Sequence, residues 1–325
     1  QSSLVTIPNK AGNTPLHWAA RNGQTDVVQR LVVLPDVDVL VKNEAGRSIL
    51  TEGFSCDKHE MVQLLLEHES ASEDKLCAIN TTNNNNSTTS VVHKFQFGSN
   101  KIQRSIRELA MAETSILGQD DPSNDTTGYA IWASSLIAAQ WMVSFDQQEF
   151  RNTTVLELGA GCGVPGLTLT CCCKHVYLTD FNETVVANLQ HNIQLNDKVS
   201  NATAHSMNWN KPESWPIQQV DVVIGSDLVY EMCMANSLLN VLKKLRPRRF
   251  LYVASSQRQG HTLFISDLQQ DFDCHERPAP DAFRSNPLIN QDDEECFVHF
   301  HELQSMDFTL YDFRRRLSST TAPGE

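Results

Sequence analysis

The sequence lacks a run of 18 apolar residues, which is the minimum that suggests a membrane-spanning helix. It has no basic-then-apolar targeting stretch after Gln1, no C-x2-C pair of the kind that holds zinc, and no evident nucleophile–base triad. We therefore predict a cytoplasmic protein with no membrane association and no metal site. Because the chain starts at Gln1 and not at methionine, we also expect further sequence upstream.

Basic residues are in the minority, with 26 Lys and Arg against 39 Asp and Glu, giving a net charge of −13. An acidic chain is a poor binder of nucleic acid, so we expect no nucleic-acid partner. The charge is compatible with a basic protein substrate, although acidity can also serve solubility alone. The nine cysteines, three of them consecutive at 171–173, are read as small apolar residues of a cytosolic, monomeric protein.

An internal repeat occupies the N-terminal region. Ala11–Ala20 aligns with Ala45–Phe54, and Asp26–Val33 aligns with Glu60–Glu67, both at an offset of 34 residues. The first copy resembles an ankyrin repeat, with the T-P-L-H signature at 14–17. The second copy departs from it, because Ile49 replaces the proline. The resemblance implies recruitment of a partner or substrate protein; the alternative is a stabilising cap on the domain that follows.

Composition shifts define the predicted domains. We place ankyrin-like repeats at 9–79, a flexible polar linker at 80–90, a catalytic domain at 91–316 and a disordered tail at 317–325. A hairpin (91–97 and 101–108) and a helix (131–145) open the third region. Strands and helices then alternate, which indicates an α/β fold with a mostly parallel, doubly wound sheet. The strands are predicted at 154–158, 176–179, 202–206, 220–225, 250–255, 274–277 and 296–306, and the helices at 164–174, 183–195, 235–245 and 260–271.

The segment Val155–Leu167, V-L-E-L-G-A-G-C-G-V-P-G-L, reads as a buried strand, a glycine turn and the start of a helix. Glycines allow a tight turn and a close approach of a ligand. Asp180 follows Gly159 by 21 positions, at the end of the next apolar run. This layout is typical of a nucleotide-type cofactor site with a carboxylate for the ribose hydroxyls.

The cofactor is not fixed by the glycines alone. Gly161, Gly163 and Gly166 satisfy G-x-G-x-x-G, which a dinucleotide site would also show. Glu157, however, puts a carboxylate at the strand end, which is unfavourable beside a pyrophosphate. The same carboxylate suits a cofactor that carries a cationic amino acid and a sulfonium.

A second motif, Asp221–Tyr230, delivers Asp227 and Tyr230 past the end of an apolar strand. In an open α/β sheet this edge faces the ligand crevice, so both side chains can serve one small site. An ordinary helix cap at Asp227 is the alternative when the motif is taken alone.

Taken together, the two motifs resemble family 16 of the seven-β-strand S-adenosylmethionine-dependent methyltransferases, which include many protein-lysine methyltransferases. The matching pieces are T-G-Y-A-I-W at 127–132, E-L-G-A-G-C-G at 157–163, L-T-D at 178–180, N-W-N around Trp209 and S-D-L-V-Y at 226–230. Ala133 and Ser134 depart from the commoner Pro-Ala. The resemblance implies a Rossmann-like seven-stranded sheet.

The resemblance also implies residue roles. S-adenosylmethionine would contact Trp132 at the pocket wall, the loop Glu157, Gly159, Ala160 and Gly161, Asp180 at the ribose, Trp209 at the adenine and Ser226 beneath it. Asp227 and Tyr230 would line the channel for the substrate amine. The predicted function is methylation of a lysine in a protein substrate. Methylation of a protein histidine or a small amine stays open, as does a non-catalytic binding module led by the repeats.

Overall fold

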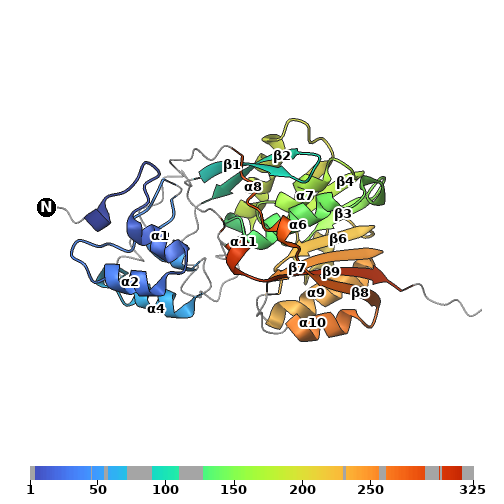
Figure 1. The fold of residues 1–325 in the computed structure, drawn as a ribbon. Coiled ribbons are helices and arrows are strands. Elements are labelled where there is room, and N and C mark those ends of the chain that lie inside the picture. The colour runs from blue at the N-terminus through green and yellow to red at the C-terminus, as the bar shows by residue number, and fades with distance from the viewer. Residues whose placement is uncertain are drawn as a thin grey trace, which may run out of the picture. The chain divides into compact units, whose positions relative to one another are not determined.

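The computed structural model describes residues 4–44, 46–54, 58–71, 90–109, 127–229, 232–255, 261–289, 300 and 302–316. Described residues within 1–94, 106–130 and 288–302 form unit 1, and those within 95–105, 131–287 and 303–325 form unit 2 (Figure 1). The predicted hairpin is present as β1 (Ser90–Phe97) and β2 (Ile102–Leu109), and its strands contribute to both units. Within the described ranges, no helix combines the length and the apolarity needed to cross a bilayer.

Two helix pairs build the repeat part of unit 1. They are α1 (Pro15–Arg21) with α2 (Thr25–Leu31), and α3 (Ile49–Phe54) with α4 (His59–Leu66). Corresponding helices start 34 residues apart, at 15 and 49 and at 25 and 59, which is the offset of the sequence repeat. Short 3-10 turns at Leu4–Thr6 and Glu69–Ala71 flank the pairs.

The two repeats start their first helices in the same way despite their different sequences. Thr14 and His17 form a capping box before α1, with the Thr14 side chain accepting from the His17 amide. Ser48, 34 residues later, accepts from the Thr51 amide at 3.2 Å. A hydroxyl therefore caps both helices, so Ile49 at the proline position does not prevent helix formation. A shared apolar core joins the pairs and includes Leu16, Val28, Leu50, Met61 and Leu65.

Unit 2 contains a seven-stranded sheet in the order β5-β4-β3-β6-β7-β9-β8. The strands are β3 (Thr154–Glu157), β4 (His175–Asp180), β5 (Ala202–Ser206), β6 (Val222–Ser226), β7 (Arg249–Ser255), β8 (Phe272–Pro278) and β9 (Phe308–Arg315). The pairs among β3 to β7 are parallel, whereas β9 runs antiparallel to both of its neighbours. This confirms the predicted α/β sheet. The order reverses at β3, so the crevice for a ligand is expected at its carboxyl end.

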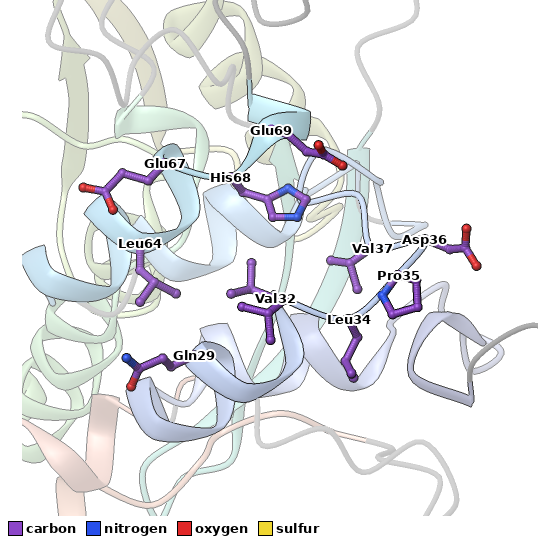
Figure 2. Close-up of a pocket in the computed structure, with 11 residues that line it drawn as sticks. Gln29, Val32, Leu34, Pro35, Asp36, Val37, Leu64, Glu67, His68 and Glu69 are labelled. Atoms are coloured by element: carbon purple, nitrogen blue, oxygen red, sulfur yellow. The ribbon is translucent and has the colours of Figure 1, made fainter.

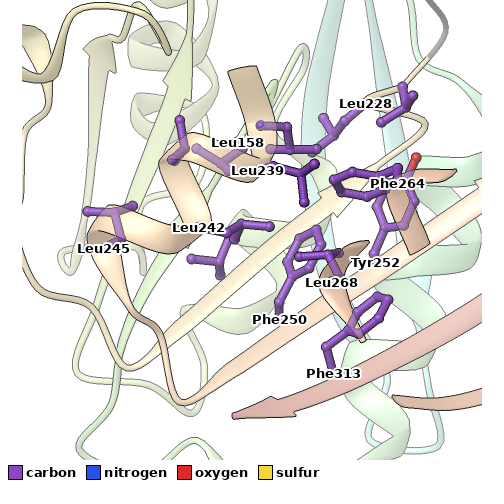
Figure 3. Close-up of a cluster of buried hydrophobic side chains, with 14 of the residues drawn as sticks. Leu158, Leu228, Leu239, Leu242, Leu245, Phe250, Tyr252, Phe264, Leu268 and Phe313 are labelled. Atoms are coloured by element: carbon purple, nitrogen blue, oxygen red, sulfur yellow. The ribbon is translucent and has the colours of Figure 1, made fainter. Parts of the chain in front are cut away.

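Helices cover the sheet and supply its apolar cores. They are α6 (Ala133–Ser144), α7 (Val164–Leu169), α8 (Glu183–Gln194), α9 (Met232–Leu245), α10 (His261–Leu268) and α11 (Glu302–Ser305), with 3-10 turns at Thr127–Tyr129, Gln147–Glu149, Pro212–Ser214 and Asp281–Phe283. Leucines of α9 and the α10 residues Phe264 and Leu268 pack on Phe250, Tyr252 and Phe313 (Figure 3). α6 and α7 pack against each other.

Two predicted elements are wrong. Residues 296–299 and 301 of the strand expected at 296–306 lie outside the described residues, and the rest of that prediction is wrong because Glu302–Ser305 is helical. The last described strand is Phe308–Arg315, where a run of aromatic residues pairs with β7. The helix expected to reach Lys174 ends at Leu169, after which the hydroxyl of Thr170 bonds back to the carbonyl of Leu167 at 2.7 Å. The predicted tail 317–325 and residues 80–89 of the predicted linker lie outside the described residues.

Candidate functional site

The glycine loop connects β3 to α7 with an unusual backbone. Gly159, Gly161 and Gly163 have φ angles of 54°, 51° and 77°, in the left-handed region that disfavours other residues. A Cβ on Gly159 would lie 2.7 Å from the Leu228 side chain, so glycine is also required by space. Ala160 is buried, and its amide donates to the carbonyl of Thr179 at 2.9 Å. The loop is thereby fixed against β4.

Asp180 ends β4, the strand beside β3. Its Oδ2 accepts from the Gly161 amide at 3.0 Å, and its Oδ1 accepts from the Phe181 amide at 2.8 Å. The structure therefore brings the predicted ribose carboxylate and the predicted glycine loop into direct contact. Bonds to backbone amides favour the ionised form of a carboxylate and fix its orientation.

Glu157, the last residue of β3, is only 2% exposed. Its Oε2 accepts from the Gly166 amide, in the first turn of α7, at 2.9 Å. Burial raises the pKa of Glu157 to about 8, against the lowering effect of this bond, and the Asp180 charge adds to the rise. The carboxyl group thus lies under the helix start. The sequence placed it at the strand end but did not show that it would be buried.

The other residues predicted to bind the cofactor are placed by elements that neighbour this loop. Trp209 follows β5, and one of its ring carbons would be 3.9 Å from a Cβ on Gly159. Ser226 ends β6, the strand beside β3 on the other side. Trp132 precedes α6, which packs against α7, and its carbonyl accepts from Ser135.

Asp227 immediately follows β6, so it lies at the same edge of the sheet as Glu157 and Asp180. Its Oδ1 accepts from both the amide and the hydroxyl of Ser255 on the neighbouring strand, at 2.7 Å and 2.9 Å. Sequence reasoning missed Ser255 as a site residue, because its relation to Asp227 depends on the pairing of β6 with β7. Tyr230, the second predicted catalytic residue, lies outside the described residues.

A surface cavity of about 510 Å³ lies in unit 1 (Figure 2). Val32, Leu34 and Leu64 contribute apolar side chains, and Asp36, Glu67 and Glu69 contribute carboxylates. The cavity contains no residue that the sequence predicted for the site. Among the described side chains, no group of three or more His, Cys, Asp or Glu could hold a metal ion.

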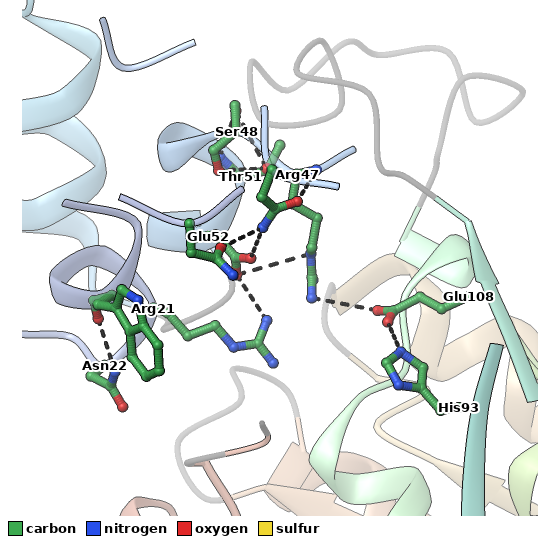
Figure 4. Close-up of polar contacts among 11 residues, drawn as sticks. Arg21, Asn22, Arg47, Ser48, Thr51, Glu52, His93 and Glu108 are labelled. Carbon is green, nitrogen blue, oxygen red and sulfur yellow. Dashed lines mark hydrogen bonds and ion pairs between the residues drawn. The ribbon is translucent and has the colours of Figure 1, made fainter. Parts of the chain in front are cut away.

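Unit 1 also contains a cluster of buried charges (Figure 4). Arg21 donates to Glu52 at 2.8 Å, Arg47 pairs with Glu108 at 3.5 Å, and His93 lies 2.9 Å from Glu108. Burial alone would raise the pKa of Glu52, but Arg47 and Arg21 outweigh it, and the pKa is lowered. The same balance lowers the pKa of Glu108. Both carboxylates are ionised and are paired with arginines of the same cluster, so we assign them a structural role.

Two family models match the chain. Residues 111–271 match the model described as lysine methyltransferase, and residues 3–100 match ankyrin repeats. The mouse protein-lysine N-methyltransferase EEF2KMT is 27% identical over 191 residues, covering 54% of this chain and 49% of the relative. The human putative protein N-methyltransferase FAM86B1 is 31% identical over 172 residues, covering 46% and 52%.

The EEF1A lysine methyltransferase 3 of Xenopus tropicalis is 26% identical over 175 residues, covering 52% of this chain and 72% of the relative. The chain thus spans about half the length of the first curated relatives it matches, 49% and 52% of them.

Proposed function

We propose that this chain, whose residues 111–271 match the lysine methyltransferase family model and whose residues 3–100 match ankyrin repeats, is an S-adenosylmethionine-dependent methyltransferase. Its acceptor is a lysine side chain of a protein substrate. The observation that carries the proposal is the bond from the Gly161 amide to Asp180, which joins the glycine loop and the carboxylate at one sheet edge.

The residues present fit this cofactor. Gly159 has no room for a Cβ, which would lie 2.7 Å from Leu228, so the bare backbone of the loop faces the ring of Trp209. In our proposal the loop Gly159, Ala160 and Gly161 holds the methionine part, Asp180 accepts from the ribose hydroxyls, and Trp209 covers the adenine. Trp132 walls the pocket, and Ser226 lies beneath the base. Glu157 acts indirectly, because it fixes the first turn of α7 by accepting a hydrogen bond from the Gly166 amide.

When bound, S-adenosylmethionine supplies a methyl group that its sulfonium already activates, so the protein mainly aligns the reactants and excludes water. A lysine, with a free pKa of about 10.4, must lose a proton before it can attack. Asp227 receives the incoming ammonium through a charge-assisted hydrogen bond, and Tyr230 lines the channel. Since a carboxylate favours the charged amine, we assign Asp227 to positioning and not to proton removal.

Calorimetric titration with S-adenosylmethionine and S-adenosylhomocysteine tests the cofactor. We expect the wild-type chain to bind both, and Asp180→Ala to weaken binding by roughly 10- to 100-fold, because a hydrogen bond to a charged group is lost. Asp146→Ala is the matched control, because Asp146 also accepts from a backbone amide (Gln148, 3.0 Å) but in an exposed turn. A folded wild-type chain that binds neither compound would overturn the proposal.

A methylation assay tests the acceptor. The Xenopus relative is named for EEF1A, so EEF1A is the first protein to incubate with the chain and a labelled methyl donor. We expect label on lysine, and loss of transfer in Asp227→Ala while cofactor binding survives. Label on a histidine or on a small amine would show that the acceptor is not a lysine. Cofactor binding without transfer to any cellular protein would favour a non-catalytic binding module.

We further propose that the repeats recruit the protein substrate and that the enzyme acts as a monomer in the cytoplasm. The acidic cavity of unit 1 and the net charge of −13 support a basic partner. The five described free cysteines support a reducing compartment. Removing charge at Asp36 and Glu67 should raise the KM for a protein substrate and leave cofactor affinity unchanged, which steady-state kinetics would measure.

A further inference from the structure

Asp227 has a backbone conformation that turns its side chain out of the strand direction. Its φ is 48°, in the left-handed region that Asp tolerates better than most residues. Its amide still donates to the Val253 carbonyl of the neighbouring strand β7 at 2.9 Å. The residue is therefore anchored by its backbone at the strand end, and the carboxylate points towards the end of β7.

Ser255, the last residue of β7, meets this carboxylate with two donors. Its amide and its hydroxyl both bond to Oδ1, at 2.7 Å and 2.9 Å, and Ser255 is 3% exposed. Among the described residues, no donor is recorded for the other oxygen, Oδ2. One oxygen of Asp227 is thus saturated inside the protein, while the other stays available.

We infer that Ser255 is a positioning and specificity-determining residue, which makes Asp227 a one-point acceptor suited to a primary ammonium and unsuited to a guanidinium. The inference rests on the proposed function, in which Asp227 receives the substrate cation. A guanidinium binds a carboxylate best through two parallel N–H bonds, one to each oxygen. With Oδ1 filled, that geometry is blocked, whereas an ammonium needs a single oxygen.

Among the described residues, His261, the first residue of α10, is a titratable group that interacts with Asp227. Burial lowers the pKa of His261, and the Asp227 carboxylate raises it by a smaller amount, so the ring is neutral at neutral pH. Its ring packs near Tyr252 and Tyr311, at 5.6 Å and 5.4 Å between centroids. A neutral imidazole does not compete with a substrate cation for Oδ2.

The test compares two small probes that differ only in the cationic head, n-butylammonium and n-butylguanidinium, titrated by NMR into the full chain with and without S-adenosylhomocysteine. We expect the wild-type chain to prefer the ammonium. Ser255→Ala should shrink the ratio of the two affinities by roughly tenfold, because the hydroxyl donor to Oδ1 is lost. Ser255→Thr, which keeps the hydroxyl, should restore the ratio, and Asp227→Ala should abolish the preference.

Ser144→Ala is the matched control, since its hydroxyl bonds only the Trp141 carbonyl of its own helix, at 2.7 Å. Misfolding of a variant would weaken both probes together. An unchanged ratio in a Ser255→Ala chain that still binds the ammonium as tightly as wild type overturns the inference, and so does a wild-type chain that prefers guanidinium or binds neither probe. Failure of the proposed function is separate, because it appears as loss of S-adenosylhomocysteine binding in the wild-type chain.

Discussion

Two buried carboxyl groups, Glu52 in unit 1 and Glu157 in unit 2, respond to burial in opposite ways. Each is less than 5% exposed, at 4% and 2%. Glu52 lies between two guanidinium groups, and its pKa is lowered. Glu157 accepts from a backbone amide and, among the described residues, is paired with no cation, and its pKa rises to about 8. Burial therefore does not decide the charge of a carboxyl group; the partner that replaces water does.

The two carboxyl groups represent two ways in which a buried acidic side chain can hold neighbouring segments together. In unit 1, charged side chains connect repeat helices to the hairpin strand β2, through Arg47 and Glu108. In unit 2, a carboxyl group that is largely protonated near neutral pH supports the first turn of α7. A protonated group keeps an acceptor oxygen for the Gly166 amide without an unpaired charge in the core.

The largest expected effect is in unit 1. Glu52→Ala should destabilise the repeat helices by about 3–5 kcal/mol, because Arg21 and Arg47 would be left buried without their carboxylate. Thermal melting and hydrogen exchange of the full chain measure the loss. Glu60→Ala, at an exposed position of α4, is the control and should change stability little. Equal effects of both variants would contradict the role given to the charge cluster.

A smaller effect is expected at the start of α7. Gly166→Ala should destabilise unit 2 by about 1–3 kcal/mol, because the added methyl group would collide with Glu157 and Leu178. Cofactor affinity should fall as well, since the collision displaces the support of the glycine loop. Denaturant unfolding together with calorimetry would detect both, and a fully stable variant would show that the Glu157 contact is dispensable.

The pH dependence at Glu157 tests the effect of burial without a steric change. Its pKa rises from 4.5 to about 8 on folding, so its contribution to stability is complete below pH 4.5 and is lost as the pH rises towards 8. Glu157→Gln keeps an acceptor oxygen but cannot ionise. Relative to wild type, the variant should therefore gain stability as the pH is raised from 5 to 8.5. Thermal melting of both proteins at the two pH values measures this difference. If the stability difference between variant and wild type is the same at both pH values, burial does not raise the pKa of Glu157.

The smallest effect is expected for an exposed pair of unit 2. Arg248 is 72% exposed and lies 3.1 Å from Asp221. Arg248→Ala should change stability by less than about 0.5 kcal/mol, because water screens such pairs. Denaturant midpoints measured in low and in 0.5 M salt should nearly coincide for the two proteins. A loss of stability comparable to that of Glu52→Ala would show that exposed and buried ion pairs contribute equally to this protein.

The sequence allowed the helix repeat, the parallel strands and the glycine turn to be predicted, because each rests on local periodicity or on a fixed offset. The last strand was misplaced because the apolar residues at 296–303 and at 308–313 compete locally, and only pairing with β7 decides between them. Pairing between strands that are far apart in the chain cannot be inferred from the local pattern of a single sequence.

Within the candidate site, Asp180 and Asp227 could be predicted from their places after apolar strands. Ser255 could not, because its relation to Asp227 depends on β6 and β7 being neighbours. The burial of Glu157 depends likewise on how closely α7 approaches β3. The roles of Tyr230 and of the cofactor-binding residues stay predictions.

The position of β9 has a consequence for the order in which the protein is made. β9 is the last described strand in the chain, yet it lies between β7 and β8, which precede it. During synthesis, β7 and β8 therefore cannot reach their final pairing until residue 315 has left the ribosome. Until then, the strand edges that β9 covers in the folded sheet have no β9 to pair with. Unpaired strand edges are sites of aggregation, so completion of this half of the sheet depends on the end of the described chain.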